Sequence, residues 1–359
     1  MNMSWGREGR QRHMSKKKKI FSYLLLFAMI AVTLVVLLRS FEIQDVFSVL
    51  MQAKYEWLFL GCLLIFLYIA CEGESMRLIC RTIGVNYSVP RGFVYAAIDI
   101  YFCAVTPSAT GGAPLMMVYM SKDDIPYTKS SVMVLLNSVM YTLAMVVLVV
   151  ISLILCPFIL REDHLFFRIC LGIGIFCSIG LITLCLLGIF RESLVERMAR
   201  KVIRLLSKLH LVRHAEALEA KLTDTFYEYK QAARILRGHP LVMLWAFLLN
   251  LAQRASYYAV AFVAYLALGG TDLATLLPLF AIQAVTSIAV YSIPLPGAMG
   301  ASEAMLLILY KMVFPEEDER VAALLLTRGI SFYLNVIFCA VVTVVHHLRI
   351  TYKKSPHDL

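Results

Sequence analysis

Runs of about 20 apolar residues recur along this chain, separated by short polar or basic stretches. A run of that length forms a helix that crosses the ~30 Å hydrocarbon core of a bilayer, because a helix rises about 1.5 Å per residue. The chain is 60% hydrophobic and 16% charged, with a mean hydropathy of +0.76. These values predict an all-α polytopic membrane protein and exclude a soluble globular domain.

The basic residues predict how the chain is oriented. Residues 1–19 end in four lysines, and the apolar run from Ile20 to Leu38 follows without a small-residue cleavage site. We therefore expect a retained first span and a cytoplasmic N-terminus. The formal net charge of +10 comes from lysines and arginines that flank the spans. Such residues face anionic lipid headgroups, so no nucleic-acid partner is expected.

Two stretches interrupt the apolar pattern, Thr106–Pro114 (TPSATGGAP) and Pro294–Glu303 (PLPGAMGASE). Their prolines and glycines break a helix. In hydrocarbon, broken backbone is tolerated only where protein or a water-filled cavity surrounds it. We therefore expect each break to lie at the bottom of a binding site, and we expect the two breaks to face each other. A simple loop between two helices is the alternative.

The arms around the first break, Gly92–Val105 and Leu115–Met120, are too short to cross ~30 Å. They predict a re-entrant hairpin, which enters and leaves the membrane by the same face. The next spans, Ser130–Cys156 and Phe166–Phe190, lead into a strongly basic segment that must be cytoplasmic. Counting back places Ser121–Lys129 inside, so this hairpin opens to the cytoplasm.

The second break has longer arms, Leu273–Ile293 and Ala304–Phe314. A span over Leu241–Leu268 precedes it, and the final span, Val321–Leu348, ends at basic residues and so begins outside. Residues 273–314 then form either a hairpin that opens outward or two complete spans. If residues 273–314 form a hairpin, the second half of the chain has the topology of the first half, inverted across the membrane.

The expected architecture is an inverted-topology repeat with two re-entrant hairpins and about six full spans. Repeat 1 covers residues 20–156 and repeat 2 covers residues 166–348, with a cytoplasmic tail at 349–359. In transporters of this design, matching Gly/Pro-interrupted segments mark the substrate site near the midplane.

Residues 191–238 form a basic amphipathic cytoplasmic segment that interrupts repeat 2. His210 and His214 in it are spaced like a metal pair, but no third ligand stands at a recognised spacing. We expect no metal site and no cofactor.

A helix that ends inside the bilayer leaves unpaired N–H groups, which bind anions. A buried charge costs ~3 kcal/mol or more unless it faces a partner or water. The expected substrate-binding residues are Thr106, Ser108, Thr110, Gly111, Gly112, Arg254, Pro296, Gly297, Gly300, Ser302, Glu303 and Arg328. Asp99 is the expected charge partner, and either Glu303 or Asp99 is expected to hold Arg254 between substrates. Structural salt bridges are the alternative role for the buried charges.

Other polar residues within the spans have simpler expected roles. Asn137, Tyr141 and Asn335 are expected to form interhelical hydrogen bonds. Glu72 and Glu74 are expected to pair locally with Arg77. The sequence contains no nucleophile-elbow, P-loop, zinc or paired-carboxylate motif, so no catalytic residue is expected.

Both breaks resemble the two signature segments of the lysylphosphatidylglycerol synthase transmembrane-region family, which is also described as flippase-like. The resemblance extends from about Ile20 to Leu348. Ala298 departs from it, because relatives commonly carry a second glycine there. In full-length resistance proteins of this family, a soluble aminoacyltransferase domain follows the membrane part and makes lysyl-phosphatidylglycerol. Only eleven residues follow Leu348 here, so we expect no synthesis by this chain alone.

The resemblance implies lipid handling. We expect a flippase that moves a phosphate-headgroup lipid across a bacterial plasma membrane: phosphatidylglycerol, lysyl-phosphatidylglycerol or polyprenyl-phosphate. The alternatives are a membrane subunit of a phosphatidylglycerol lysyltransferase or other lipid-modifying transferase, and a non-transporting anchor. The candidate protein partners are a soluble aminoacyltransferase and a second copy of the chain.

Overall fold

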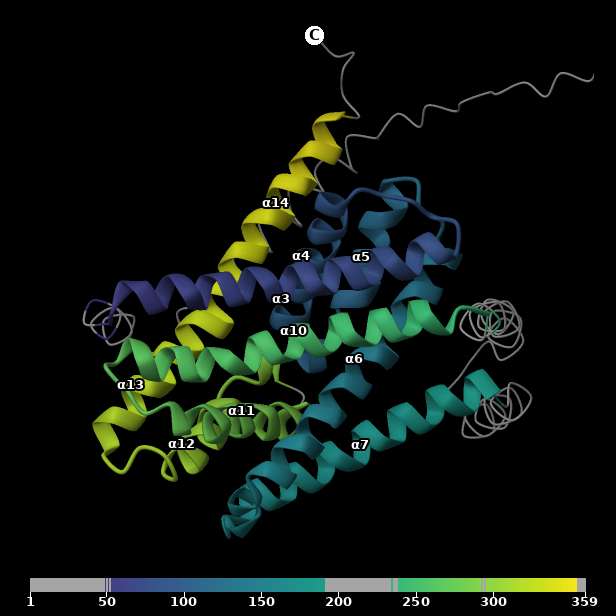
Figure 1. Ribbon diagram of the computed structural model, residues 1–359. Helices are drawn as coiled ribbons and strands as arrows, with labels where there is room; N and C mark the ends of the chain where they lie inside the picture. Colours follow the sequence, from purple (N-terminus) through teal and green to yellow (C-terminus); the bar gives the residue numbers. More distant parts are fainter. Residues whose placement is uncertain are drawn as a thin grey trace, which may run out of the picture.

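The computed structural model describes residues 53–190 and 238–353 apart from 292 and 294, together with residues 49, 51 and 234 (Figure 1). The expected first span, Ile20 to Leu38, lies outside the described residues. So does nearly all of the basic segment expected at residues 191–238.

Every regular element in this described part is a helix. The long helices are α3 (Tyr55–Thr82), α4 (Val89–Val105), α5 (Gly112–Lys122), α6 (Tyr127–Leu155), α7 (Leu165–Phe190), α10 (Pro240–Ala267), α11 (Leu276–Val290), α12 (Ala301–Tyr310), α13 (Glu317–Arg328) and α14 (Asn335–Lys353). The short turns are η1 (Pro107–Ala109), η2 (Pro157–Arg161), η3 (Leu273–Thr275), η4 (Pro296–Ala298) and the π-helix η5 (Gly329–Leu334).

Five of the described segments are long and apolar enough to cross a membrane: Tyr55–Thr82, Tyr127–Leu155, Leu165–Thr183, Leu273–Val290 and Glu317–Thr351. The expected all-α polytopic membrane fold is thereby confirmed. The helix expected over Leu241–Leu268 is α10, which is 28 residues long and lies beside α3 (Figure 1).

Large apolar side chains point outward from these helices. Phe59, Phe66, Phe176 and Trp245 are between 52% and 78% exposed. Exposed apolar surface on this scale would promote aggregation in water, whereas lipid tails contact it without cost.

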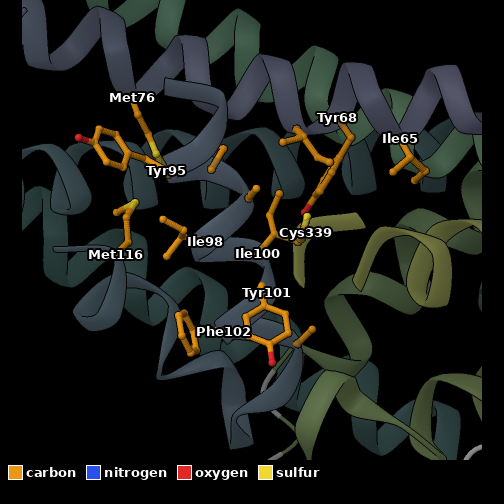
Figure 2. Close-up of a cluster of buried hydrophobic side chains, with 14 of the residues drawn as sticks. Ile65, Tyr68, Met76, Tyr95, Ile98, Ile100, Tyr101, Phe102, Met116 and Cys339 are labelled. Atoms are coloured by element: carbon orange, nitrogen blue, oxygen red, sulfur yellow. The ribbon is translucent and has the colours of Figure 1, made fainter. Parts of the chain in front are cut away.

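The interior between α3, α4 and α5 is filled by aromatic and sulfur-containing side chains (Figure 2). Tyr95, Tyr101, Tyr119 and Met116 are each 0–2% exposed. Large side chains packed at this density hold the short helices α4 and α5 in one arrangement.

Both sequence breaks form a short hairpin. Helices α4 and α5 pack on either side of η1, and α11 and α12 pack on either side of η4. With ten residues, α12 is about 15 Å long and cannot cross a ~30 Å core. Residues 273–314 are therefore not two complete helical spans, which favours the re-entrant alternative.

The two turns at the hairpin tips, η1 and η4, lie against each other as expected. Each turn has the sequence Pro-x-Ala, and its alanine adopts a left-handed backbone, with φ of 53° at Ala109 and 51° at Ala298. An alanine in this region costs about 1–2 kcal/mol, so two such residues at matching positions indicate a shared turn geometry. The two halves of the chain therefore share a short sequence and its turn geometry at the hairpin tips.

At its other end the first hairpin is attached to α14 by a polar cluster. Tyr95 Oη donates to Asp123 Oδ2 at 2.8 Å, and His346 Nε2 lies 3.3 Å from the same oxygen. Burial raises the pKa of Asp123, but hydrogen bonds from His346 and Tyr95 outweigh burial and hold the pKa below its usual range. Nearby, Tyr119 Oη is 2.8 Å from His347 Nδ1.

Candidate functional site

A cavity of about 480 Å³ with a mixed polar and apolar lining lies where the two hairpin tips meet α3, α6, α10 and the η5 region. That volume falls in the range of pockets that hold small ligands. Polar side chains from nine helical elements contribute to its lining: Glu72, Asp99, Asn137, Ser138, Tyr141, Arg254, Gln283, Ser287, Ser302, Arg328, Ser331 and Asn335. Charged and amide side chains at this depth mark substrate or ion pathways in membrane proteins.

Arg328 is placed in the cavity by the end of α13, where the helix widens into η5. Its Nε donates to Glu303 Oε1 at 2.7 Å, and its guanidinium lies 4.4 Å from the ring centroid of Phe332. Nη2 of Arg328 is buried without a hydrogen-bond partner. The guanidinium is therefore held in place from one side and keeps a free donor for a ligand. Short π-helices often occur at functional sites, and η5 fits that tendency.

Glu303 holds the second hairpin in shape as well as pairing with Arg328. Its Oε2 accepts from the Gly300 backbone N–H at 2.6 Å and from Ser302 Oγ at 2.9 Å. Gly300 has a φ of 78°, which a glycine adopts without strain. The start of α12 is thus capped by the carboxylate that also binds Arg328, and this couples the tip geometry to the buried ion pair.

Arg254 lies near the middle of α10 and is 6% exposed. Its guanidinium stacks over the ring of Tyr141, with 3.8 Å between Cζ and the ring centroid. Its Nε is buried without a hydrogen-bond partner, and it forms no ion pair with any described residue. We expected Glu303 or Asp99 to hold Arg254 between substrates. Glu303 binds Arg328 instead, because α13 and not α10 presents its arginine to the start of α12.

Glu72 was expected to pair with Arg77, and this was wrong. Arg77 binds Glu74, with Nε–Oε2 at 2.7 Å. Glu72 is 5% exposed, lines the cavity, and accepts a hydrogen bond from Gln253 Nε2 at 2.7 Å. Glu72 and Glu74 are two positions apart on α3, so their carboxyl groups point to different faces of the helix. Gln253 lies on α10, far from Glu72 in the sequence, so the sequence alone could not reveal the hydrogen bond between them.

Asn137 forms an interhelical network, as expected. Its Oδ1 accepts from Ser75 Oγ at 2.7 Å and from Asn250 Nδ2 at 3.3 Å, which joins α3, α6 and α10. The ring of Tyr141 instead stacks against the guanidinium of Arg254. Asn335 lines the cavity, and its Oδ1 accepts a hydrogen bond from Cys339 Sγ in the same helix.

The structure brings together only some of the predicted site residues. Asp99, Arg254, Gly297, Ser302 and Arg328 line the cavity. The remaining predicted residues whose side chains are described, Thr106, Thr110, Gly111, Gly112, Pro296, Gly300 and Glu303, support the hairpin tips and are outside the lining. The side chain of Ser108 lies outside the described atoms.

The polar residues of the first tip bond to their own turn. Thr106 Oγ1 donates to Phe102 O and accepts from the Gly111 N–H at 2.9 Å, and Thr110 Oγ1 donates to Pro107 O. Gly112 was expected to let a headgroup or the opposing backbone approach closely. A Cβ at that position would lie 2.7 Å from the backbone oxygen and from Oδ1 of Asp99, so the glycine permits the close approach of α5 to α4.

The cavity lining contains two arginines whose chemistry suits an anion. Arg254 and Arg328 each present a planar guanidinium that is held in place by an aromatic ring and has an unused buried donor. Such groups bind phosphate oxygens in two places. Within the described residues, no cluster of three His, Cys, Asp or Glu side chains could hold a metal ion.

Comparisons with known proteins agree with the resemblance. A family model described as lysylphosphatidylglycerol synthase TM region matches residues 21–339, which include both breaks and every residue of the cavity lining. The chain is 24% identical over 316 residues to a UPF0104 membrane protein from Archaeoglobus fulgidus, a match that covers 87% of this chain and 93% of that protein. No solved structure matches this chain.

Proposed function

Because this chain belongs to the lysylphosphatidylglycerol synthase TM-region family, we propose that it moves a lipid with a phosphate headgroup between the leaflets of a plasma membrane. Candidate headgroups are phosphatidylglycerol, its lysyl form and a polyprenyl-phosphate. The supporting observation is the pair of buried arginines, Arg254 and Arg328, that face one cavity with unused donors.

The arrangement suits a headgroup whose tails remain in lipid. The headgroup must leave water, and its phosphate loses hydration that only charged donors can replace. The cavity offers two guanidiniums for this purpose, while the outer surface of the helices is apolar and accommodates acyl chains. The phosphate would lie between Arg254 on α10 and Arg328 on α13, where the two hairpin tips meet.

The test is leaflet exchange by the purified full-length chain in vesicles that contain a fluorescent phosphatidylglycerol. Fluorophores that reach the outer leaflet are quenched by an impermeant reductant. We expect exchange by the wild type and at least a tenfold loss in Arg254→Ala, since about 1.4 kcal/mol of lost phosphate binding corresponds to tenfold. Arg254→Lys should lose part of the activity, because it keeps the charge but not the planar fork.

Arg168→Ala is the matched control, because Arg168 is exposed on α7, pairs with Asp163 and lies outside the cavity lining. Full exchange by Arg254→Ala would remove Arg254 from the site. A wild type that modifies the lipid, detected by mass spectrometry of the vesicle lipids, would favour the transferase alternative.

A further inference from the structure

The cavity contains an acidic pair that phosphate binding leaves unexplained. Glu72 on α3 and Asp99 on α4 both line the cavity, and their carboxyl groups interact electrostatically. Gln253 Nε2 donates to Glu72 Oε2 at 2.7 Å. Oδ1 of Asp99 is buried without a hydrogen-bond partner. Neither carboxyl forms an ion pair with a described residue.

A buried carboxylate without a cation partner is unfavourable in its ionised form, because burial removes its hydration. Two ionised carboxylates this close would also repel each other strongly in a buried site. Burial and mutual repulsion therefore both favour binding of an exchangeable proton by the pair. Its position in the cavity lining gives that proton a path to water whenever the cavity is open.

The charged and titratable groups around the pair come from four helices. Tyr68 and Cys103 lie on the same helices as the two acids, Arg254 faces them from α10, and Cys339 faces them from α14. Arg254 is the one cation among these neighbours in the described structure. Helix α5 approaches Asp99 at Gly112, whose lack of a side chain leaves room for Asp99 Oδ1.

Arg254 thus faces two competing sets of anionic oxygens. In the empty cavity its positive charge favours ionised carboxyl groups in the pair. A phosphate bound to Arg254 would neutralise that charge and add negative charge beside the acids. Both changes favour proton uptake, and linkage requires that protonation of the pair strengthens phosphate binding to the same extent.

We propose that Glu72 and Asp99 form a proton-binding site that takes up one proton as an anionic headgroup binds at Arg254 and releases it as the headgroup leaves. This inference rests on the proposed function and adds its coupling ion. In the uptake step a carboxylate oxygen forms an O–H bond with a proton from water on the open side. In the release step that bond breaks, and the proton returns to water on the opposite side.

The experiment is calorimetric titration of the detergent-purified full-length chain with dihexanoyl-phosphatidylglycerol. Titrations in two buffers of different ionisation enthalpy report the protons taken up on binding. We expect uptake approaching one proton in the wild type, with affinity falling up to tenfold for each pH unit of increase in the range where the pair titrates. Glu72→Gln and Asp99→Asn should still bind the lipid but show neither proton uptake nor this pH dependence.

Glu74→Gln is the matched control, since Glu74 lies two residues away on α3, binds Arg77 and should leave uptake unchanged. Thermal unfolding of each variant checks its fold. If one of the two substitutions prevents folding, the other still tests the proposal. Wild-type binding without proton uptake, or equal uptake in Glu72→Gln and Asp99→Asn, would overturn the proton site while leaving the flippase intact. Binding that depends on sodium and not on pH would also overturn it. Absence of any binding by the wild type would instead contradict the proposed function for phosphatidylglycerol.

Discussion

At the scale of single residues, the charged side chains of the cavity differ in what they depend on. Arg328 is fixed by a carboxylate in an ion pair, whereas Arg254 stacks on an aromatic ring and forms no ion pair with a described acid. Removing one member of a buried ion pair leaves the other without a partner, at a cost of about 3–5 kcal/mol. Arg254 has no such dependence, so its loss should affect binding more than folding.

The Glu303–Arg328 pair gives a stability prediction. Glu303→Gln keeps an oxygen that can cap Gly300 but removes the charge, so it should lower the free energy of unfolding by about 3 kcal/mol or more. Arg328→Met should cost a similar amount. The double variant should be more stable than the sum of the single effects implies, because no unpaired charge remains. Denaturant unfolding in detergent micelles measures all three, and strictly additive losses would contradict the buried ion pair.

Among individual residues, sequence reasoning found those whose chemistry is unusual for a membrane span. Arg254 and Arg328 stood out because an arginine in hydrocarbon requires a reason. Glu72 did not stand out, because Arg77 lies nearby in the sequence and offered a simpler partner. The structure shows that Arg77 binds Glu74, whereas Glu72 packs against α10 and binds Gln253. The pairing of Glu303 with Arg328 likewise depends on tertiary packing between residues 25 positions apart.

At the scale of helices, the sequence predicted where the helices lie, because prolines, glycines and charged residues separate the apolar runs. Val105 ends α4 as expected, since proline follows at the second position after it. The length of α5 was underestimated, because Gly112 to Pro114 were assigned to the break. In the structure Pro114 lies in the first turn of α5, where its missing N–H costs nothing.

The contact between the first hairpin and α14 predicts an acid sensitivity. The folded pKa of Asp123 is below its usual range, so its stabilising contribution is complete above the unfolded value of about 4 and is lost as pH falls through the folded pKa. Asp123→Asn should therefore lower the melting temperature at neutral pH, and the difference from wild type should shrink on acidification.

Asp124→Asn is the control for this test, because Asp124 is adjacent and exposed and its backbone φ of 66° is one that asparagine tolerates. Melting curves of the three proteins across an acid titration supply the measurement. A loss in Asp123→Asn that is the same at every pH would show that the carboxylate charge is not the stabilising feature.

At the scale of the whole molecule, the inverted repeat makes a prediction about sidedness. If the repeats are inverted, the two hairpins enter from opposite faces, so residues 121–129 should be cytoplasmic and residues 315–320 external. Single cysteines at Lys122 and Glu317, in a background without the nine native cysteines, can be treated with an impermeant thiol reagent on intact cells. We expect labelling at Glu317 alone. Labelling at both positions, or at Lys122 alone, would contradict the inverted arrangement.

The meeting of the two hairpin tips also has a consequence for biosynthesis. Residues of η1 leave the ribosome long before those of η4, and at about 5–20 residues per second the interval is on the order of 10–40 s. During this time the first broken turn lacks the neighbour that later covers it, although exposed broken backbone is unfavourable in lipid. The nascent first half must therefore be sheltered, by the insertion machinery or by water retained around the tip, until the last helices arrive.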